Sequence, residues 1–440
     1  MTWDLAIVAL GVMAYALISR WTASSPITAP IVFVSFGLAA GALFSLFDLA
    51  PGSAAIETLA EATLVLILFV DASRIRFAAL RREYAVPLRL LGVGLPLTIA
   101  AGAVLAAIVF PEFDLGAALV LAVALAPTDA ALGQAVVSNP RLPSRISQGL
   151  NVEGGLNDGI CVPLLLVALA IMLSEAGDAQ PVATLLQQMG GGILVGAAVG
   201  AAAALLLGFA RRRRTITGEW GQIATLVTAV LTYAIAVPLG GSGFIAAFTG
   251  GAVFGVVFAR ARAEEPTADE PTADRREPTL LLDEFGAILV AVTFVVFGAT
   301  ILPDALGHVT WPMLIYVALS LTVVRMLPVA LAMLGSHARL PTVAFLGWFG
   351  PRGLASIVFA VIIIEDVTGL PATGTIVTTI ILAVAVSVFA HGLSAAPLAK
   401  RYASWFTTHP RAGEIMESRP APKHRGRFLG PTKPRRPGDD

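Results

Sequence analysis

The sequence predicts an all-α polytopic membrane protein with thirteen transmembrane helices, arranged as inverted repeats that each contain one discontinuous helix. Hydrophobic residues make up 57 % of the 440 residues and charged residues 13 %, and the mean hydropathy of +0.83 exceeds that of a soluble domain. Apolar segments long enough to cross a hydrocarbon core of about 30 Å recur along the chain. Two of these segments carry matched interruptions by Pro and Gly, which should break their helices within the membrane.

Six predicted spans fill the first part of the chain, at residues 3–19, 27–47, 56–73, 86–110, 114–138 and 144–173. Seven more follow, at residues 187–210, 220–239, 243–259, 282–302, 310–334, 341–364 and 372–397. Short turns with Gly, Pro or charged residues separate them. We expect residues 1–405 to form one transmembrane domain, in which spans 1–6 and 8–13 are the two repeats and span 7 connects them.

The segments outside the spans are polar. Residues 263–278 contain a near-repeat of Glu-Pro-Thr-Ala-Asp and are predicted to form a mobile cytoplasmic loop. Residues 406–440 are rich in Pro, Arg and Lys and are predicted to form a disordered cytoplasmic tail. The first twenty residues lack a basic start and a small-residue cleavage site, so we expect them to be retained as the first span.

The distribution of Lys and Arg predicts the orientation of the spans. Thirteen spans place the two termini on opposite sides of the membrane. With the N-terminus outside, 17 of the 29 Lys and Arg residues fall in inner loops, ten follow from Lys400 onward, and Arg325 and Arg352 lie within spans. None remains for the outer loops, which carry acidic residues instead. The positive-inside rule therefore predicts a cell-membrane protein with its N-terminus outside and its C-terminus in the cytoplasm.

Two spans are interrupted at corresponding positions of the two repeats. The fifth span contains Ala126-Pro127-Thr128-Asp129, and the twelfth contains Gly350-Pro351-Arg352-Gly353. Proline removes a backbone donor and glycine weakens a helix, so both spans should break near the middle of the membrane and expose peptide groups. Because Pro and Gly are common in membrane helices, either break alone is a weak indication. The matched pair predicts a binding site where the two breaks meet.

The sixth span carries Glu153, Asn157 and Asp158 within an otherwise apolar run. A carboxylate at bilayer depth costs about 2.5–3.5 kcal/mol on insertion scales, so retained acids indicate an ion pathway. At about 100° per residue, Glu153 and Asn157 share a helix face, whereas Asp158 points about 100° away from Asn157. We expect Asp158 to face a cavity near the breaks. The alternative for Asp158 is a protonated structural acid, and for Glu153 a structural ion pair is favoured.

The two arginines within spans are the available partners for Glu153. Arg325 lies in an apolar stretch and needs an anion, unless its long side chain extends to the inner surface. Arg352 lies beside a break, where carbonyl groups and helix dipoles can hold its guanidinium group. The residues alone leave open which arginine pairs with Glu153.

Oxygen ligands for a cation are predicted at two further places. Thr128 and Asp129 offer a hydroxyl and a carboxylate at the first break, which suit a hard cation. Asp129 is equally suited to capping the second half of its own interrupted helix. Asp71 ends the third span near the inner surface, where a pair with Arg74 explains it as well as a role in ion binding does.

At this point the chain resembles the monovalent cation:proton antiporters, specifically the sodium/proton exchanger (NhaP-type) branch, over roughly residues 5 to 400. The motifs that carry the resemblance are Phe69-Val70-Asp71-Ala72, Pro127-Thr128-Asp129, Glu153-Gly154-Gly155-Leu156-Asn157-Asp158-Gly159, Arg325 and Gly350-Pro351-Arg352-Gly353. The resemblance implies a homodimer of thirteen-span protomers, each with a mobile core in which spans 5 and 12 cross.

The resemblance also implies roles for individual residues. It implies that Asp158 binds a cation or a proton, with Thr128 and Asp71 as further cation ligands, and that Asn157 shapes the site. It implies that Glu153 pairs with Arg325. Asn157 before Asp158 is typical of the electroneutral branch, in which one cation exchanges for one proton. Gly154 departs from the pattern, because many relatives have serine there and this chain lacks that hydroxyl.

The predicted function is therefore exchange of a monovalent cation, Na⁺ first and K⁺ or Li⁺ as alternatives, for H⁺ by competition at one buried carboxylate. A sodium-coupled symporter of an organic anion is the alternative, although the carboxylates disfavour an anion. We predict no enzymatic activity and no cofactor, since the five histidines show no metal-ligand spacing and the single cysteine, Cys161, has no catalytic partner and no disulfide partner. The expected partners are the lipid bilayer and a second copy of the chain, and no nucleic acid.

Overall fold

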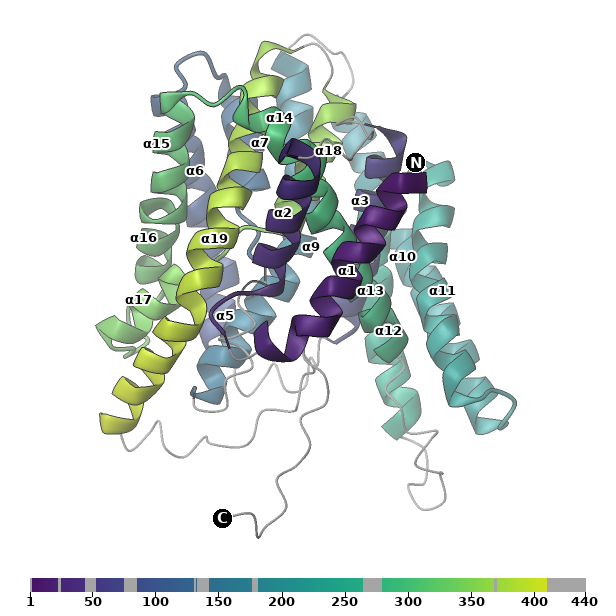
Figure 1. Cartoon of the computed structure of the whole chain (residues 1–440). Helices are drawn as coiled ribbons and strands as arrows, with labels where there is room; N and C mark the ends of the chain where they lie inside the picture. The colour runs from purple at the N-terminus through teal and green to yellow at the C-terminus, as the bar shows by residue number, and fades with distance from the viewer. Residues whose placement is uncertain are drawn as a thin grey trace.

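The computed structural model describes residues 2–22, 25–43, 53–74, 85–129, 132, 142–175, 181–263, 279–367 and 370–409. These residues form a bundle of helices that run roughly along one direction, and no strand occurs among them (Figure 1). Residues 264–278 of the predicted loop at 263–278 and residues 410–440 of the predicted tail lie outside the described residues. The helix that precedes this tail ends at Thr408, so residues 406–408 of the predicted tail are helical.

The first six predicted spans correspond to α1 (Thr2–Thr22), α2 (Ala29–Leu38) with the π-helix η1 (Ala39–Leu43), α3 (Ala54–Ser73), α5 (Ala85–Arg89) with η2 (Leu90–Gly94) and α6 (Leu95–Val109), α7 (Leu115–Ala124), and α9 (Ser144–Glu175). The remaining spans correspond to α10 (Pro181–Arg212), α11 (Gly218–Ala236) with η3 (Val237–Leu239), α12 (Gly243–Ala263), α13 (Leu280–Val296) with η4 (Phe297–Ile301) and α14 (Leu302–Leu306), α15 (Trp311–Leu321) with α16 (Val323–Ala332), α17 (Leu340–Trp348) with α18 (Leu354–Asp366), and α19 (Pro371–Thr408).

The helices have the length and composition of membrane spans. Among the described residues, nine helical segments are long and apolar enough to cross a membrane, and three shorter apolar helices accompany them. The prediction of an all-α polytopic membrane protein is confirmed. The count of thirteen spans stays a prediction, because most of the predicted fifth span after its break lies outside the described residues.

Both predicted interruptions occur. Helix α7 ends at Ala124, and the next five residues are not helical; α17 ends at Trp348, and α18 begins only at Leu354. The two breaks are in direct contact, since the backbone N–H of Asp129 donates to the carbonyl oxygen of Pro351 at 2.7 Å. The two interrupted spans therefore meet at their breaks, a place that we call the crossing.

A third interruption was not predicted. The eleventh span, expected to be continuous over 310–334, is divided into α15 and α16 at Thr322, whose φ of −114° and ψ of −86° are not helical. Pro328 within α16 cannot donate a hydrogen bond to the carbonyl of Val324, and its ring crowds that carbonyl. The proline therefore weakens this end of α16, and Arg325 lies in its first turn.

Glycines allow several helices to approach very closely. A Cβ atom added at Gly251 of α12 would lie 2.3 Å from the carbonyl oxygen of Phe69 on α3, and one at Gly37 of α2 would lie 2.1 Å from the carbonyl oxygen of Val295 on α13. Only glycine fits at such distances. Small residues promote this kind of close packing between membrane helices, where dispersion forces replace the hydrophobic effect.

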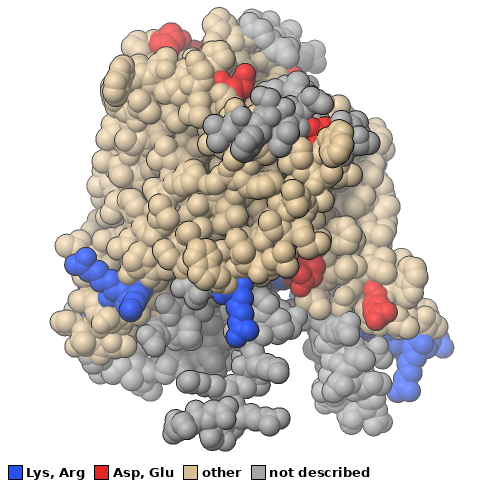
Figure 2. All heavy atoms as spheres, viewed as in Figure 1, with Lys and Arg blue, Asp and Glu red and all other residues tan. Residues whose placement is uncertain are grey.

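Positive charge is segregated to one end of the bundle. On the face shown in Figure 2, Lys and Arg side chains gather at a single end, whereas acidic side chains occur at both ends. We call this the basic end, and it is defined by Arg20 in the last turn of α1, Arg211 and Arg212 in the last turn of α10, and Arg339 before α17. Segregation of this kind is what the predicted orientation requires.

Candidate functional site

Helix α9 presents different residues to different neighbours. At about 100° per residue, Glu153 and Asn157 share one face and Gly155 and Gly159 share another, with Asp158 between the two faces. Glu153, Asn157 and Asp158 are 2 %, 1 % and 8 % exposed. Since polar groups this deeply buried need partners, the neighbours of each face determine what the site can do.

Asn157 is tied to the first break. Its side-chain Nδ2 donates a hydrogen bond to Oγ1 of Thr128 at 2.7 Å, and Thr128 is itself only 4 % exposed. Among the described residues, nothing donates a hydrogen bond to the buried Oδ1 atom of Asn157. The structure therefore places two uncharged oxygen-bearing side chains together, beside the carboxylate-bearing residue Asp158. Such oxygen atoms are the ligands that hard cations prefer.

Glu153 forms an ion pair with Arg325. The Nη1 atom of Arg325 lies 2.6 Å from Oε1 of Glu153, and each side chain is 2 % exposed. The alternative that Arg325 extends to the inner surface is therefore wrong. Gly350 in the second break makes room for this pair, because a Cβ atom there would lie 2.3 Å from Nε of Arg325. The pair fixes α9 to α16 and neutralises both charges inside the protein.

Arg352 of the second break holds the first break. Its Nη1 atom donates hydrogen bonds to the carbonyl oxygens of Ala126 at 2.7 Å and Pro127 at 3.1 Å, and the residue is 0 % exposed. These carbonyls follow the end of α7, where helical donors are missing. The positive guanidinium group also suits the negative end of the α7 dipole. The second break thus supplies the hydrogen-bond donor that the carbonyl groups of the first break lack.

Asp129 caps the second half of the other interrupted span. Its Oδ2 atom accepts a hydrogen bond from the backbone N–H of Leu354 at 3.1 Å, at the start of α18. The cap that was predicted within its own span falls on residues after 129 that lie outside the described residues, and the structure adds a cap across the crossing, because the two breaks lie side by side. A Cβ atom at Gly353 would lie 2.1 Å from this Oδ2 atom, so the cap also requires glycine there.

Asp71 lies beside the site on the face that α9 turns toward α3. It is half-buried in the last turn of α3, and a Cβ atom at Gly155 would lie 3.4 Å from its Cβ and 3.8 Å from its Oδ2. Arg74, the alternative partner considered for Asp71, forms an ion pair with Asp283 of α13. The structure thus brings Asp71 next to α9 at Gly155, which lies one helical turn before Gly159 and three residues before Asp158.

Two residues near the site were not predicted to belong to it. The Oγ atom of Ser387 accepts a hydrogen bond from the backbone N–H of Arg352 at 2.6 Å and lies 3.1 Å from Nδ1 of His391. His391 is 1 % exposed and packs with its ring 5.0 Å from that of Trp348. The spacing of Ser387 and His391, four residues apart within an apolar helix, is the only indication that sequence offers.

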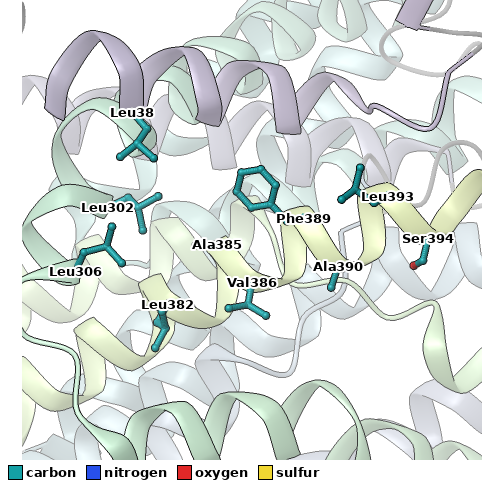
Figure 3. A pocket seen from close by; sticks show the side chains of 10 residues that line it. All are labelled: Leu38, Leu302, Leu306, Leu382, Ala385, Val386, Phe389, Ala390, Leu393 and Ser394. Atoms are coloured by element: carbon teal, nitrogen blue, oxygen red, sulfur yellow. The ribbon is translucent and has the colours of Figure 1, made fainter. Parts of the chain in front are cut away.

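A groove on the outside of α19 is not part of this site. Figure 3 shows side chains from α2, α14 and α19 around it, and Ser394 alone among its lining residues is polar. Most of its α19 residues lie on the face opposite Ser387 and His391, by the helical angle of about 100° per residue, and Ser394 at its edge accepts a hydrogen bond from Nε1 of Trp348. Within the described part of the chain, no group of three or more His, Cys, Asp or Glu side chains is placed to hold a metal ion. The polar centre at the crossing is therefore the candidate ion site.

Comparisons with known proteins agree with this arrangement. The family model described as "Sodium/hydrogen exchanger, transmembrane" matches residues 7–401. The K(+)/H(+) antiporter NhaP2 of Shewanella oneidensis is 26 % identical over 384 residues, and the match covers 84 % of this chain and 62 % of the relative. The chain thus spans about three fifths of the length of this curated relative.

Two solved structures of one protein have a similar fold. The sodium proton antiporter MjNhaP1 from Methanocaldococcus jannaschii at pH 8 superposes with a TM-score of 0.73 at 20 % sequence identity, covering 91 % of this chain and 98 % of that one. The electron-microscopy map of the same antiporter gives a TM-score of 0.72 at 20 % identity, with coverage of 93 % and 99 %. At this identity the likeness establishes the fold.

Proposed function

The chain belongs to the sodium/hydrogen exchanger family of multi-pass membrane transporters, and from this premise we propose that it exchanges a monovalent cation for protons by competition at Asp158. The observation that carries the proposal is the position of Asp158. This carboxyl group is 8 % exposed and follows Asn157, which is hydrogen-bonded to Thr128 at the crossing of the two breaks.

The other charges at the crossing are engaged with one another or with the backbone. Glu153 is paired with Arg325, and Asp129 caps α18. Arg352 is committed to the carbonyl groups at the end of α7. We therefore assign the exchangeable charge to Asp158. A proton or a cation can neutralise its carboxylate, but one excludes the other, because both need the same oxygen atoms.

Neighbouring oxygen atoms complete the proposed cation site. Asn157 directly precedes Asp158, and Thr128, which is hydrogen-bonded to Asn157, lies at the crossing; both side chains are buried. A bound cation would give the Oδ1 atom of Asn157 the partner that it lacks among the described residues. Asp71 is the further proposed ligand from α3. With one titrating carboxylate, each loaded form carries one proton or one monovalent cation, so exchange is proposed to be electroneutral and 1:1.

Na⁺ is the proposed cation, and K⁺ is the second candidate. The relative from Shewanella oneidensis is named a K⁺/H⁺ antiporter, whereas the structural neighbour from Methanocaldococcus jannaschii is named a sodium proton antiporter. Li⁺ shares the same oxygen chemistry. We further propose a homodimer in the cell membrane, with the basic end in the cytoplasm and the N-terminus outside.

The test is a proton-flux assay in proteoliposomes with each alkali cation in turn, with the membrane potential imposed or collapsed. We expect saturable, cation-dependent proton movement that does not respond to the potential. Asp158→Asn should abolish this movement while the protein keeps its thermal stability and oligomeric state. Normal exchange by Asp158→Asn would overturn the assignment, and proton or sodium movement that requires an organic anion would favour a symporter.

A further inference from the structure

The face of α9 beside Asp158 is built from two glycines one helical turn apart. A Cβ atom at Gly159 would lie 2.1 Å from both Cδ2 and Cε2 of Phe248 on α12, so the aromatic ring rests directly on the backbone of α9. A Cβ atom at Gly155 would meet the side chain of Asp71 on α3 at 3.4 Å. An apolar ring and a carboxyl group therefore contact the same helix face, about 6 Å apart along its axis.

These two contacts lie on opposite sides of Asp158 along the bundle. Asp71 is in the last turn of α3, next to Arg74, at the basic end of that helix. Phe248 is near the start of α12, which runs toward Arg260 and so begins at the end of the bundle opposite the basic end. Helix α9 runs from the basic end past Gly155, then Asp158, then Gly159. The ring thus covers α9 on the far side of Asp158.

We propose that Phe248 is a positioning residue of the exchange site, whose ring on Gly159 closes α9 against α12 and leaves the Asp71 side as the approach to Asp158 in this state. The inference rests on the proposed function and extends it to a residue outside the ion ligands. A phenyl ring offers no ligand to an ion and excludes water, whereas a carboxyl group attracts cations. A cation should therefore reach Asp158 from the Asp71 side and not from the Phe248 side.

A double-mutant cycle tests the contact between the ring of Phe248 and Gly159. Alanine at position 159 must displace the ring of Phe248, which is half-buried and has room to move. We expect Gly159→Ala to lower the rate of cation-driven proton exchange by about tenfold, within the range that small misplacements of reacting groups produce. In the Gly159→Ala/Phe248→Ala double variant the clash is absent. Its rate should match that of Phe248→Ala alone instead of showing the product of two losses.

A cysteine introduced on the Gly159 side of α9 provides a readout that does not depend on transport. Val162 lies one turn beyond Asp158 and Gly159, within about 60° of both around the helix, and is 3 % exposed, whereas Cys161 points about 160° away from Gly159. In a Cys161→Ser/Val162→Cys background, a charged, membrane-impermeant methanethiosulfonate reagent added at the end opposite the basic end should label position 162 about tenfold faster when Phe248→Ala is added. Cys161→Ser alone gives the background.

Phe244→Ala is the matched control, because Phe244 is half-buried one turn earlier on α12 and its ring packs against Tyr233 of α11. In the same background it should leave the labelling rate at position 162 unchanged. Multiplied losses in the double variant, or equal labelling at position 162 with and without Phe248→Ala, would overturn the role of Phe248. Exchange that survives Asp158→Asn would instead overturn the proposed function, and the labelling result would still decide the role of the ring.

Discussion

Removal of one partner of the buried Glu153–Arg325 pair should destabilise the protein strongly. The Nη1 and Oε1 atoms lie 2.6 Å apart and both side chains are 2 % exposed, so water cannot replace a lost partner. An uncompensated buried charge of this kind costs about 3–5 kcal/mol. Arg325→Met leaves the carboxylate of Glu153 unpaired, and Glu153→Gln leaves the guanidinium group unpaired, so each single variant should show a loss of this size.

The double variant Glu153→Gln/Arg325→Met separates the cost of an unpaired charge from the cost of lost side-chain packing. It removes both charges and keeps similar side-chain volumes, and neutral replacements of buried pairs often cost little. We expect it to recover most of the stability that either single variant loses. A coupling free energy of about 5 kcal/mol or more between the two positions follows from these values.

The assay is thermal unfolding of the purified protein in detergent, followed by tryptophan fluorescence. A loss of 3–5 kcal/mol lowers Tm by about 5 °C or more, given a shift of about 2–4 °C per kcal/mol for domains of 150–250 residues. Trp3→Phe, a change at a residue that is 76 % exposed, serves as a control for substitution itself. Single variants with an unchanged Tm, or a double variant as unstable as the two losses added together, would refute this reasoning.

Three further predictions concern the crossing. Thr128→Ala removes the hydrogen bond to Asn157, worth about 0.5–1.5 kcal/mol, and should raise the cation concentration at half-maximal exchange by about three- to tenfold; an unchanged concentration dependence would exclude Thr128 from the site. Asp129→Ala removes the cap of α18 and should cost about 1 kcal/mol in unfolding experiments, whereas Asp129→Asn should retain most of it; equal losses would show that charge, and not capping, is what matters. Ser387→Ala leaves a buried backbone N–H without its acceptor and should cost about 1–3 kcal/mol, measured as a lower Tm, and Ser387→Thr should lose less; a Tm equal to that of the wild type would contradict this account of the break.

The spans and the two breaks were predictable because the rules behind them are local. Apolar length and bilayer thickness fix a span within one segment, and Pro127 and Pro351 disturb the hydrogen bonds of their own turns. The division of the eleventh span at Thr322 was missed, although Pro328 lies nearby, because the same sequence pattern also permits a merely kinked helix.

The site was predictable only in part. Burial of Glu153, Asn157 and Asp158 follows from their position in an apolar run, and the structure confirms that all three are buried. Their partners did not follow in the same way, because the residues alone left two arginines available to Glu153. The contact of Asn157 with Thr128 depends on how the sixth span packs against the first break.

The sequence by itself determined that this chain is a helical membrane protein with an acidic residue at bilayer depth and two helices that break. The tertiary structure alone decided that Asp129 caps α18, that Arg352 holds the carbonyls of the other break, and that Phe248 rests on Gly159. Hydropathy and helix propensity act within a few turns of one segment. Contacts between residues roughly 90 to 230 positions apart arise only when packed helices bring them together, and no local rule encodes that approach.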